Sequence, residues 1–287
     1  MTPAAIAATL RAAGCVFADD EARLLIDTAA TPAALDDMVR RRAGGLPLEQ
    51  VIGWAEFCGQ RIVVDPGVFV PRRRSEFLVI QAAALTPPNA IAVDLCCGTG
   101  ALGASLAARR PLAELHATDI DPAAVRCAQK NIGSVGGKAY HGDLFQPLPA
   151  RLRGQVFILI SNAPYVPTAE LTLMPPEARD HEPRVALDGG GDGLDVVRRI
   201  AADAARWLAP GGSWLVETSE RQARVAEEIL RGGGLDPRSV VSADHGVTVL
   251  IGTRRDLCAG PKPARVIAAK SLSWRSSRAI RRARADR

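Results

Sequence analysis

The sequence predicts an α/β fold: a doubly wound, mostly parallel seven-stranded sheet preceded by a small helical N-terminal domain. From residue 90 onwards, short apolar strand patterns alternate with helix patterns, which is typical of parallel strands joined by helical crossovers. Residues 156–160 are all apolar, as expected for a central strand that is buried on both faces. Residues 2–43 contain only helix patterns, so the sheet must be built from the later part of the chain.

The composition is that of an ordinary globular protein. The chain has 287 residues, of which 47% are apolar and 23% charged, enough to bury a sizeable core. No apolar run approaches the roughly 20 residues of a membrane span, and no basic residue precedes the apolar stretch at the N-terminus as in a secretory signal. Membrane-spanning, collagenous and disordered classes are therefore excluded. The aromatic content of 4% argues against an RNA-binding platform built on stacking.

The positive charge is concentrated at the C-terminal end. Residues 262–287 carry nine Lys or Arg and one Asp, whereas the rest of the chain carries 27 basic and 30 acidic side chains. We expect the tail, residues 258–287, to be solvated and disordered; the alternative is contact with RNA or the ribosome, which salt would weaken. The six cysteines lack metal-binding spacing, so we expect reduced thiols in a cytoplasmic protein. The four histidines form no ligand pattern, and no metal site is predicted.

The first part of the chain is predicted to form helices and one hairpin. Thr2-Pro3 and Thr31-Pro32 each place an N-cap before a proline that suits the first helical position, and Asp19-Asp20 are expected to cap the helix between them. Residues 44–47 end this helical unit. Further predicted elements are strands at 54–58 and 61–64 around Gly59-Gln60, a loop at 65–71 and a helix at 76–85.

The alternating part of the chain begins after Thr86-Pro87-Pro88. The predicted strands are 91–95, 115–118, 156–160, 213–216 and 247–251, with a further strand ahead of Asp143. The predicted helices are 101–110, 122–132, 194–208 and 221–230, the last of which ends at the three glycines 232–234.

A glycine-containing loop joins the first strand of this part to its helix. Residues 98–103 satisfy G-x-G-x-x-G, the dinucleotide fingerprint, so a NAD-binding oxidoreductase is one interpretation. Asp94 at the end of the strand opposes it, because a carboxylate repels a pyrophosphate but favours the sulfonium and ammonium groups of S-adenosylmethionine. The predicted cofactor is therefore S-adenosylmethionine. Its predicted binding residues here are Asp94, Cys96, Cys97, Gly98, Thr99 and Gly100.

Two further acids follow the next two strands. Asp119 stands 19 residues after Gly100, where an acid can accept hydrogen bonds from both ribose hydroxyls. Asp143, followed by Leu144, could accept one from an adenine amino group. Each aspartate could instead cap a helix or turn, but three acids after three successive strands suit a cationic nucleoside better. We expect Asp119, Asp143 and Leu144 to bind the cofactor.

The segment after the apolar run is Asn162-Ala163-Pro164-Tyr165. Ligands of open α/β sheets bind beyond the carboxyl ends of the strands, so this segment should face the methyl group of the cofactor. At this point the sequence resembles the HemK-type protein-(glutamine) N-methyltransferases, whose pattern here is N-P-P-Y. The resemblance covers residues 44–253 and includes 47–49, 68–72, 142–145, 182–184, 186–190, and Glu217 with Gln222.

The resemblance carries several expectations. The best-known members of the family methylate the glutamine of the GGQ loop in peptide chain release factors, so the family implies a Rossmann-like class I methyltransferase that acts in translation termination in the cytoplasm. It implies a protein partner with a target glutamine. The expected division is a substrate-recognition domain at 1–43, a hairpin linker at 44–75, a catalytic domain at 76–257 and the basic tail at 258–287.

The chemistry agrees with this family. A planar amide nitrogen is a poor nucleophile because its lone pair is delocalised into the carbonyl. The side-chain oxygen of Asn162, which also borders the cofactor, and the backbone carbonyl of Ala163 could hold both N–H bonds and aim the nitrogen at the sulfonium methyl. Pro164 restricts the backbone of Ala163, and Tyr165 would pack against the flat amide. The simpler alternative for these four residues is a turn that ends the strand.

Several residues depart from the family pattern, among them Arg73 and Ser75 in the segment 72–76, where the family has proline and threonine. Ala163 replaces the first proline but keeps the carbonyl, so we predict retained activity with a looser loop, and Ala163→Pro should not abolish turnover. Cys96 replaces a glycine, which a thiol tolerates if φ is negative at that position. Arg74 replaces an acid and reverses the charge near the pocket mouth. These departures predict a divergent paralogue, for which a release factor is one candidate substrate.

Two other functions stay open beside the NAD-binding oxidoreductase. The same four residues can present the exocyclic amino group of adenine or guanine in nucleic acid; the basic tail favours this alternative and the acidic body opposes it. The other is a cofactor-binding module without catalysis, which an Asn162→Ala variant with unchanged kinetics would indicate.

Overall fold

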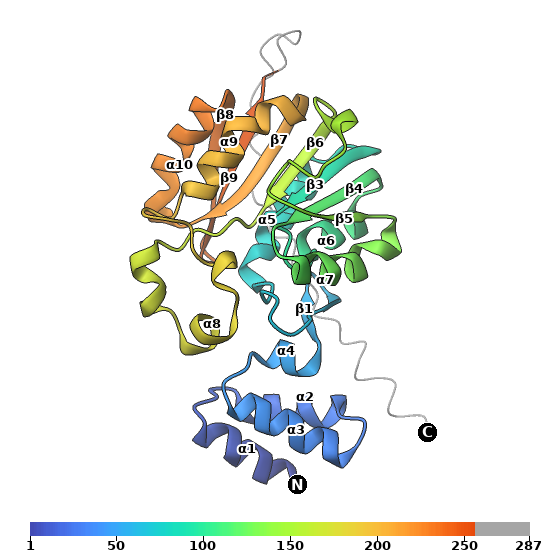
Figure 1. Cartoon of the computed structure of the whole chain (residues 1–287), viewed down its shortest axis with the longest axis vertical. Coiled ribbons are helices and arrows are strands. Elements are labelled where there is room, and N and C mark those ends of the chain that lie inside the picture. Colours follow the sequence, from blue (N-terminus) through green and yellow to red (C-terminus); the bar gives the residue numbers. More distant parts are fainter. Residues whose placement is uncertain (256–287) are drawn as a thin grey trace. The chain divides into compact units, whose positions relative to one another are not determined.

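The computed structural model describes residues 1–255 (Figure 1). The predictions for the basic tail, residues 258–287, and for Cys258 lie outside the described residues. Within residues 1–255, no helix is long and apolar enough to cross a membrane, and no group of three or more His, Cys, Asp or Glu could hold a metal ion.

A seven-stranded sheet with the strand order β5-β4-β3-β6-β7-β9-β8 organises the part of the chain after residue 85. The strands from β5 to β7 run parallel to their neighbours, and β9 runs antiparallel to both β7 and β8. This confirms the predicted doubly wound, mostly parallel sheet. The strands are β3 (Ala90–Leu95), β4 (Leu112–Asp119), β5 (Lys138–His141), β6 (Val156–Ser161), β7 (Leu208–Thr218), β8 (Leu235–Ser242) and β9 (Val247–Arg254).

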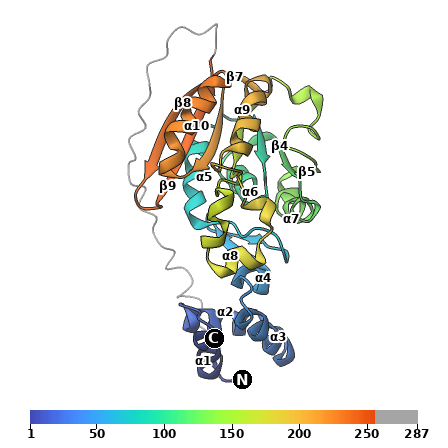
Figure 2. The same cartoon turned by 60° about the vertical axis from the view of Figure 1, so that its left-hand side comes forward.

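Strand β6 shows why this sheet needs helices on both faces. Ile158 and Ile160 belong to one core cluster, whereas Leu159 between them belongs to another, because successive strand residues point to opposite faces. Helices α5, α6 and α7 cover the first face. Helices α9 and α10 cover the second, against the β7–β9 half of the sheet (Figure 2). Their bounds are α5 (Glu76–Leu85), α6 (Ala101–Arg109), α7 (Pro122–Ile132), α9 (Asp195–Trp207) and α10 (Glu220–Gly232).

The order of the strands creates a crevice at the carboxyl ends of β3 and β6. The chain enters the sheet at β3, adds β4 and β5 on one side, and then returns to place β6 on the other side of β3. The loops that leave β3 and β6 therefore diverge over opposite halves of the sheet. Open α/β sheets bind their ligands at such a point.

The N-terminal helices α1 (Pro3–Ala12), α2 (Ala18–Thr28) and α3 (Pro32–Ala43) have a hydrophobic core of their own. The predicted N-caps are confirmed, since the side chains of Thr2 and Thr31 accept hydrogen bonds from backbone N–H groups at 3.2 and 3.1 Å. The prediction that Asp19 and Asp20 cap α2 is wrong. Helix α2 begins at Ala18, so both aspartates lie in its first turn, where a carboxylate is stabilised by the helix dipole.

The predicted hairpin is confirmed as β1 (Trp54–Phe57) and β2 (Gln60–Val63), and it follows a short helix, α4 (Leu48–Ile52), that was not predicted. Asn131 on α7 holds the hairpin by accepting from the Val63 N–H at 2.8 Å and donating to the Val63 carbonyl at 2.9 Å. Strand β8 was also not predicted, because Pro237 argues against a strand. It is tolerated since β8 lies at the edge of the sheet, where one side needs no hydrogen bonds.

Candidate active site

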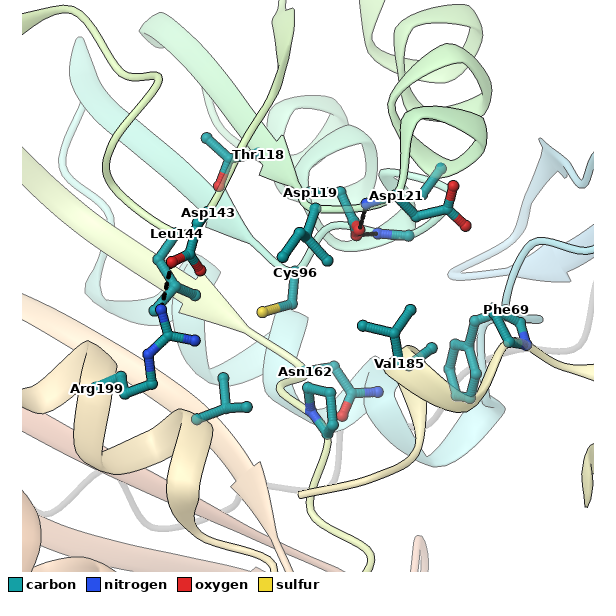
Figure 3. Close-up of a pocket in the computed structure, with 17 residues that line it drawn as sticks. Phe69, Cys96, Thr118, Asp119, Asp121, Asp143, Leu144, Asn162, Val185 and Arg199 are labelled. Atoms are coloured by element: carbon teal, nitrogen blue, oxygen red, sulfur yellow. Dashed lines mark hydrogen bonds and ion pairs between the residues drawn. The ribbon is translucent and has the colours of Figure 1, made fainter. Parts of the chain in front are cut away.

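A pocket lies at the carboxyl ends of the parallel strands (Figure 3). Its lining comes from the loops that follow β3, β4 and β6, from the segment after β5, from α7 and α9, and from Phe69 and the segment 183–186. The predicted residues that line it are Cys96, Gly98, Asp119, Asp143, Leu144, Asn162 and Pro164.

The loop after β3 is compact because two of its glycines adopt positive φ. Gly98 has φ +53° and Gly100 has φ +73°, and a Cβ on Gly100 would lie only 3.1 Å from side-chain atoms of Ala128 and Ile132 on α7. Gly100 thus serves the packing of α6 against α7 and does not line the pocket. The sequence therefore needs glycine here for two separate reasons, conformation and close approach.

Asp119 at the end of β4 is fixed by the backbone around it. Its Oδ2 accepts from the Gly98 N–H and its Oδ1 from the Asp121 N–H, each at 2.9 Å. Each carboxylate oxygen accepts more than one hydrogen bond, so Asp119 retains acceptor capacity toward the pocket that it lines. Burial raises the pKa of this carboxyl above its ordinary value of 3.8. A rigid, partly desolvated acceptor at this place suits a pair of sugar hydroxyls.

The adenine interpretation of Asp143 requires a carboxylate that can accept a hydrogen bond from a ligand. One oxygen of Asp143 is already used, because it forms an ion pair with Arg199 on α9. Figure 3 shows the two side chains meeting at one edge of the pocket, beside Leu144. Arg199 lines the pocket and was not predicted from the sequence. A signal for it is weak, since a basic residue in the second turn of a helix is ordinarily solvated. The Asp143 oxygen that Arg199 does not engage can still accept from a ligand.

Two non-glycine residues of this pocket have left-handed backbone conformations. Cys96 has φ +55° and Leu144 has φ +49°. The expectation of a negative φ at Cys96 is therefore wrong, and the thiol is held in a conformation that the usual glycine would adopt without strain. Strained backbone of this kind concentrates at functional sites. Burial raises the pKa of the Cys96 thiol, so the side chain is neutral and unreactive.

The remaining predicted cofactor residues lie behind or beside the main pocket. Asp94 is fully buried and does not line it; its Oδ2 accepts from the Gly103 N–H at 2.9 Å, which fixes the first turn of α6. Burial raises the pKa of Asp94 well above 3.8, and the nearby Asp119 adds to the shift. Cys97 and Thr99 line a smaller adjoining pocket together with Ser75.

A second pocket adjoins the first on the far side of Asn162. It is lined by Ala163 and Tyr165 of the predicted tetrapeptide. Asn162 and Phe69 line this pocket, the main pocket and the small pocket beside Cys97, so they stand at the junction of all three. Within residues 1–255, neither Oδ1 of Asn162 nor the carbonyl of Ala163 accepts a hydrogen bond from the protein. The other lining residues of this acceptor-side pocket are Arg72, Arg74, Val166, Met174, Ala186 and Leu187.

The tetrapeptide is held from behind by the glycine-rich segment 187–193. The N–H of Val166 donates to the Leu187 carbonyl at 3.1 Å, and the N–H of Gly189 returns a bond to the Val166 carbonyl at 2.8 Å. A Cβ on Gly193 would meet the carbonyl oxygen of Tyr165 at 2.3 Å, so only glycine permits this approach. The side chain of Gln222 on α10 also donates to the Tyr165 carbonyl, at 2.9 Å. The backbone of the loop is thus fixed although Ala163 replaces proline.

Comparison with known proteins places this geometry in a family. A family model described as the methyltransferase small domain matches residues 60–174. The chain is 36% identical over 224 residues to a protein of Geobacter sulfurreducens named release factor glutamine methyltransferase, covering 77% of this chain and 78% of the relative. It is 33% identical to a Streptomyces pristinaespiralis protein named 4-amino-L-phenylalanine/4-methylamino-L-phenylalanine methyltransferase, over 78% of both chains.

The chain belongs to the release factor glutamine methyltransferase family. The resemblance that the motifs indicated is thereby confirmed, and with it an S-adenosylmethionine-dependent methyltransferase rather than a NAD-binding oxidoreductase. A 16S rRNA methyltransferase of T. thermophilus, solved in complex with AdoMet and guanosine, has the same fold, with a TM-score of 0.50 and 22% identity over 70% of this chain and 50% of that one.

Several residues of the family motifs also fix the walls of the acceptor-side pocket. Glu182 accepts from the Val70 N–H at 3.2 Å and from Arg72 at 2.5 Å, which fastens the segment before α5 to the segment after the tetrapeptide. Arg74, which departs from the pattern, contacts the Tyr165 hydroxyl at 2.5 Å. The sequence predicted Arg74 near the pocket mouth, where it lies, but it did not predict the partners of Arg72, Arg74 and Glu182. Their contacts span more than 90 residues of chain, and no local pattern predicts such a pairing.

Proposed function

We propose that the protein methylates the side-chain amide nitrogen of a glutamine in a peptide chain release factor. The observation that supports this proposal best is the position of Asn162 and Ala163. Both have an oxygen that accepts no hydrogen bond from the described residues 1–255, and Asn162 lies where the main pocket and the acceptor-side pocket meet. Two acceptors side by side match the two N–H bonds of a primary amide.

In this proposal the two pockets hold the two substrates. Asp119 binds the ribose hydroxyls, while Asp143 and Leu144 border the base, and Cys96 and Gly98 follow the nucleoside on its other side. When bound, S-adenosylmethionine supplies an electrophilic methyl group on a positively charged sulfur. Asn162 and the Ala163 carbonyl hold the acceptor amide by both N–H bonds, so that its nitrogen faces the main pocket.

The acceptor side excludes water and orients the amide. Phe69, Tyr165 and Leu187 provide flat or apolar walls for the planar group. Burial and the neighbouring Glu217 carboxylate raise the pKa of the Tyr165 phenol above 10, so this side chain stays neutral at physiological pH. No side chain of the pocket has to ionise before the nitrogen attacks; the nitrogen would gain the methyl group as the methyl–sulfur bond breaks, and the nitrogen would then release one of its two protons. Orientation therefore supplies most of the rate, as the delocalised lone pair of an amide requires.

The release factor is the protein partner in this proposal, which agrees with the name of the 36% identical relative. The helices at 1–43 form a core separate from that of the sheet, which suits the substrate-recognition domain. Residues 76–255 supply most of the lining of the two pockets, and Phe69, Arg72 and Arg74 of the predicted linker complete it. Translation termination places this reaction in the cytoplasm. A contact of the basic tail with RNA or the ribosome remains part of the proposal, because nine basic residues and one acidic residue give residues 262–287 a net positive charge, whereas acidic residues outnumber basic ones in the rest of the chain.

The test uses the full chain, S-adenosylmethionine with a tritiated methyl group, and a release factor that contains a GGQ loop. We expect label in the intact factor and none when its GGQ glutamine is replaced by alanine, with the modified residue mapped by mass spectrometry. Equal concentrations of 4-amino-L-phenylalanine, ribosomal RNA and DNA serve as competing acceptors. Label on one of these and not on the release factor would contradict the proposed acceptor while leaving methyl transfer intact.

A further inference from the structure

A buried carboxylate lies behind the acceptor-side pocket, and the function proposed above uses it only as a neighbour of Tyr165. Glu217, near the end of β7, is 1% exposed. Its Oε2 accepts from the Ser75 hydroxyl at 2.5 Å. Its Oε1 accepts from Nε of Arg74 at 3.0 Å and from the Tyr165 hydroxyl at 3.4 Å. Three donors from two distant segments thus converge on one side chain.

The hydrogen bonds that lead from Glu217 to Asn162 can run in only one direction. An ionised carboxylate only accepts, so the single hydrogen of the Ser75 hydroxyl is used on Glu217. The Ser75 oxygen can then only accept, and its partner is Nδ2 of Asn162 at 3.3 Å. Because Ser75 can only accept here, the amide of Asn162 is oriented with its nitrogen toward Ser75 and its oxygen away from it.

The orientation of this amide decides what Asn162 can do for the acceptor. With Oδ1 directed away from Ser75, Asn162 offers an acceptor to the substrate N–H. With the amide turned over, it would offer N–H groups to an amino group that has two N–H bonds of its own. Two donors cannot form a hydrogen bond, and the buried groups would be left without partners.

Arg74 gives this arrangement its charge balance. A buried charge is costly unless it is paired, and Arg74 supplies the opposite charge to Glu217 at 3.0 Å. The same guanidinium donates to the Tyr165 hydroxyl at 2.5 Å, so it also fixes one wall of the acceptor-side pocket. The charge reversal at position 74 relative to the family pattern therefore has a structural partner in Glu217.

We propose that Glu217, acting through Ser75, is a positioning residue that sets the amide orientation of Asn162, and that Arg74 holds Glu217 in place and balances its charge. This inference rests on the proposed amide methylation for its kinetic effect. The orientation itself is a property of the protein and can be measured without an acceptor.

The decisive variant is Glu217→Gln, which keeps the shape and removes the obligate acceptor. The new amide can donate to Ser75, whose hydroxyl then donates to Asn162 and favours the inverted amide. We expect kcat with the release factor to fall about 10- to 100-fold, while the dissociation constant of S-adenosylhomocysteine changes less than about threefold. In ¹⁵N–¹H spectra of the S-adenosylhomocysteine complex, the side-chain NH₂ signals of Asn162, identified by their loss in Asn162→Asp, should shift.

The serine provides an independent test if Glu217→Gln does not fold. Ser75→Ala removes the intermediate hydroxyl and should lower kcat by a similar factor, whereas Ser75→Thr keeps the hydroxyl and should restore at least half of the wild-type kcat. The Ser75→Ala/Glu217→Gln double variant should be no slower than the slower single variant, because both break the same chain of bonds. Additive losses would overturn the proposal.

Glu21→Gln is the matched control. Glu21 is also a buried carboxylate paired with an arginine, Arg42, at 2.6 Å, but it joins α2 to α3 in the N-terminal helices. This variant should leave the Asn162 signals unchanged, which shows that losing a buried carboxylate–arginine pair elsewhere in the protein does not move them. Unchanged Asn162 signals in Glu217→Gln and Ser75→Ala would overturn the positioning role whatever the acceptor proves to be. If the Asn162 signals shift in these two variants but the wild-type protein does not label the release factor, only the proposed function is contradicted.

Discussion

The two main pockets of this protein meet at Asn162 but are assembled in different ways. Most of the cofactor pocket is built by the ends of three consecutive strands, between residues 96 and 144. The acceptor-side pocket is built by segments near residues 69–74 and 162–187, held by Gln222 and Glu217 from farther along the chain. The first depends on a repeated local pattern and the second on single long-range contacts. The cofactor site is therefore easier to predict from a sequence than the acceptor site.

The largest effect is expected at the junction of the two pockets. Asn162→Ala removes an acceptor for the substrate amide, and kcat should fall about 10²- to 10³-fold, the usual effect of losing one preorganised polar group. Stopped-time assays with labelled methyl donor measure kcat, and calorimetry measures S-adenosylhomocysteine binding. Binding should change less than about tenfold, because Asn162 only borders the cofactor pocket. A variant with wild-type kcat would contradict the role of Asn162 in holding the acceptor amide.

The cofactor half should respond in binding rather than in turnover. Asp119→Asn removes the charge that strengthens the hydrogen bonds to ribose hydroxyls, and the dissociation constant of S-adenosylhomocysteine should rise about 10- to 100-fold. Since burial raises the pKa of Asp119, wild-type affinity should weaken as the pH falls through a value above 3.8, where the carboxylate takes up a proton. Calorimetric titrations across pH check this, and Asp119→Asn should show a flatter profile.

Asp94 and Asp119 are both acids beside the loop after β3, but only Asp119 lines the pocket. Because Asp94 lies behind the loop, Asp94→Asn should change the dissociation constant of S-adenosylhomocysteine less than about threefold, in contrast to Asp119→Asn. The folded state holds its proton more tightly than the unfolded state, so stability should fall as the pH rises from 3.8 through the raised pKa. Urea unfolding at several pH values measures this slope, which Asp94→Asn should reduce. A large loss of cofactor affinity would restore the sequence-based role of Asp94.

The smallest expected effect concerns the strained loop. Cys96→Gly relieves a left-handed conformation at the cost of a more flexible unfolded chain, and the net gain in unfolding free energy should be about 0.5–1 kcal/mol. Urea denaturation checks the sign. Cys97→Gly makes the same substitution at a neighbouring residue without positive φ, so it should destabilise the protein. If both variants lose stability, packing rather than backbone strain decides the residue at position 96.

The sequence predicted most of the fold because its elements have local signals. Helix α5 and helix α7 have the bounds that their caps and apolar patterns indicated, and β6 is the buried central strand. Strand β7 begins at Leu208, five residues before the predicted start. Gly211 and Gly212 interrupt its pairing with β6 but do not end the strand, since Leu208 pairs with Val156 on the far side of this irregularity. Composition alone would assign those glycines to a loop.

The site was predicted in outline but not in detail. Asp119 and Asn162 lie in the pocket because the carboxyl ends of parallel strands meet at one edge, a rule that needs no coordinates. The same rule misplaced Asp94, since it says where a strand ends but not which way the last side chain points. Arg199, Phe69 and Ser75 reach the site through tertiary packing from other elements. Their positions depend on distances between segments that the sequence does not state.

The side chain of Gln222 has a consequence for how the protein would fail on heating. Its Nε2 donates to the carbonyls of both Tyr165 and Asp192 at 2.9 Å from the first turn of α10. Helix ends open at lower temperature than buried strands, so fraying of this turn releases both carbonyls together. Warmed protein would then lose its hold on incoming polypeptide while the nucleoside stays bound, and inactivation would precede global melting.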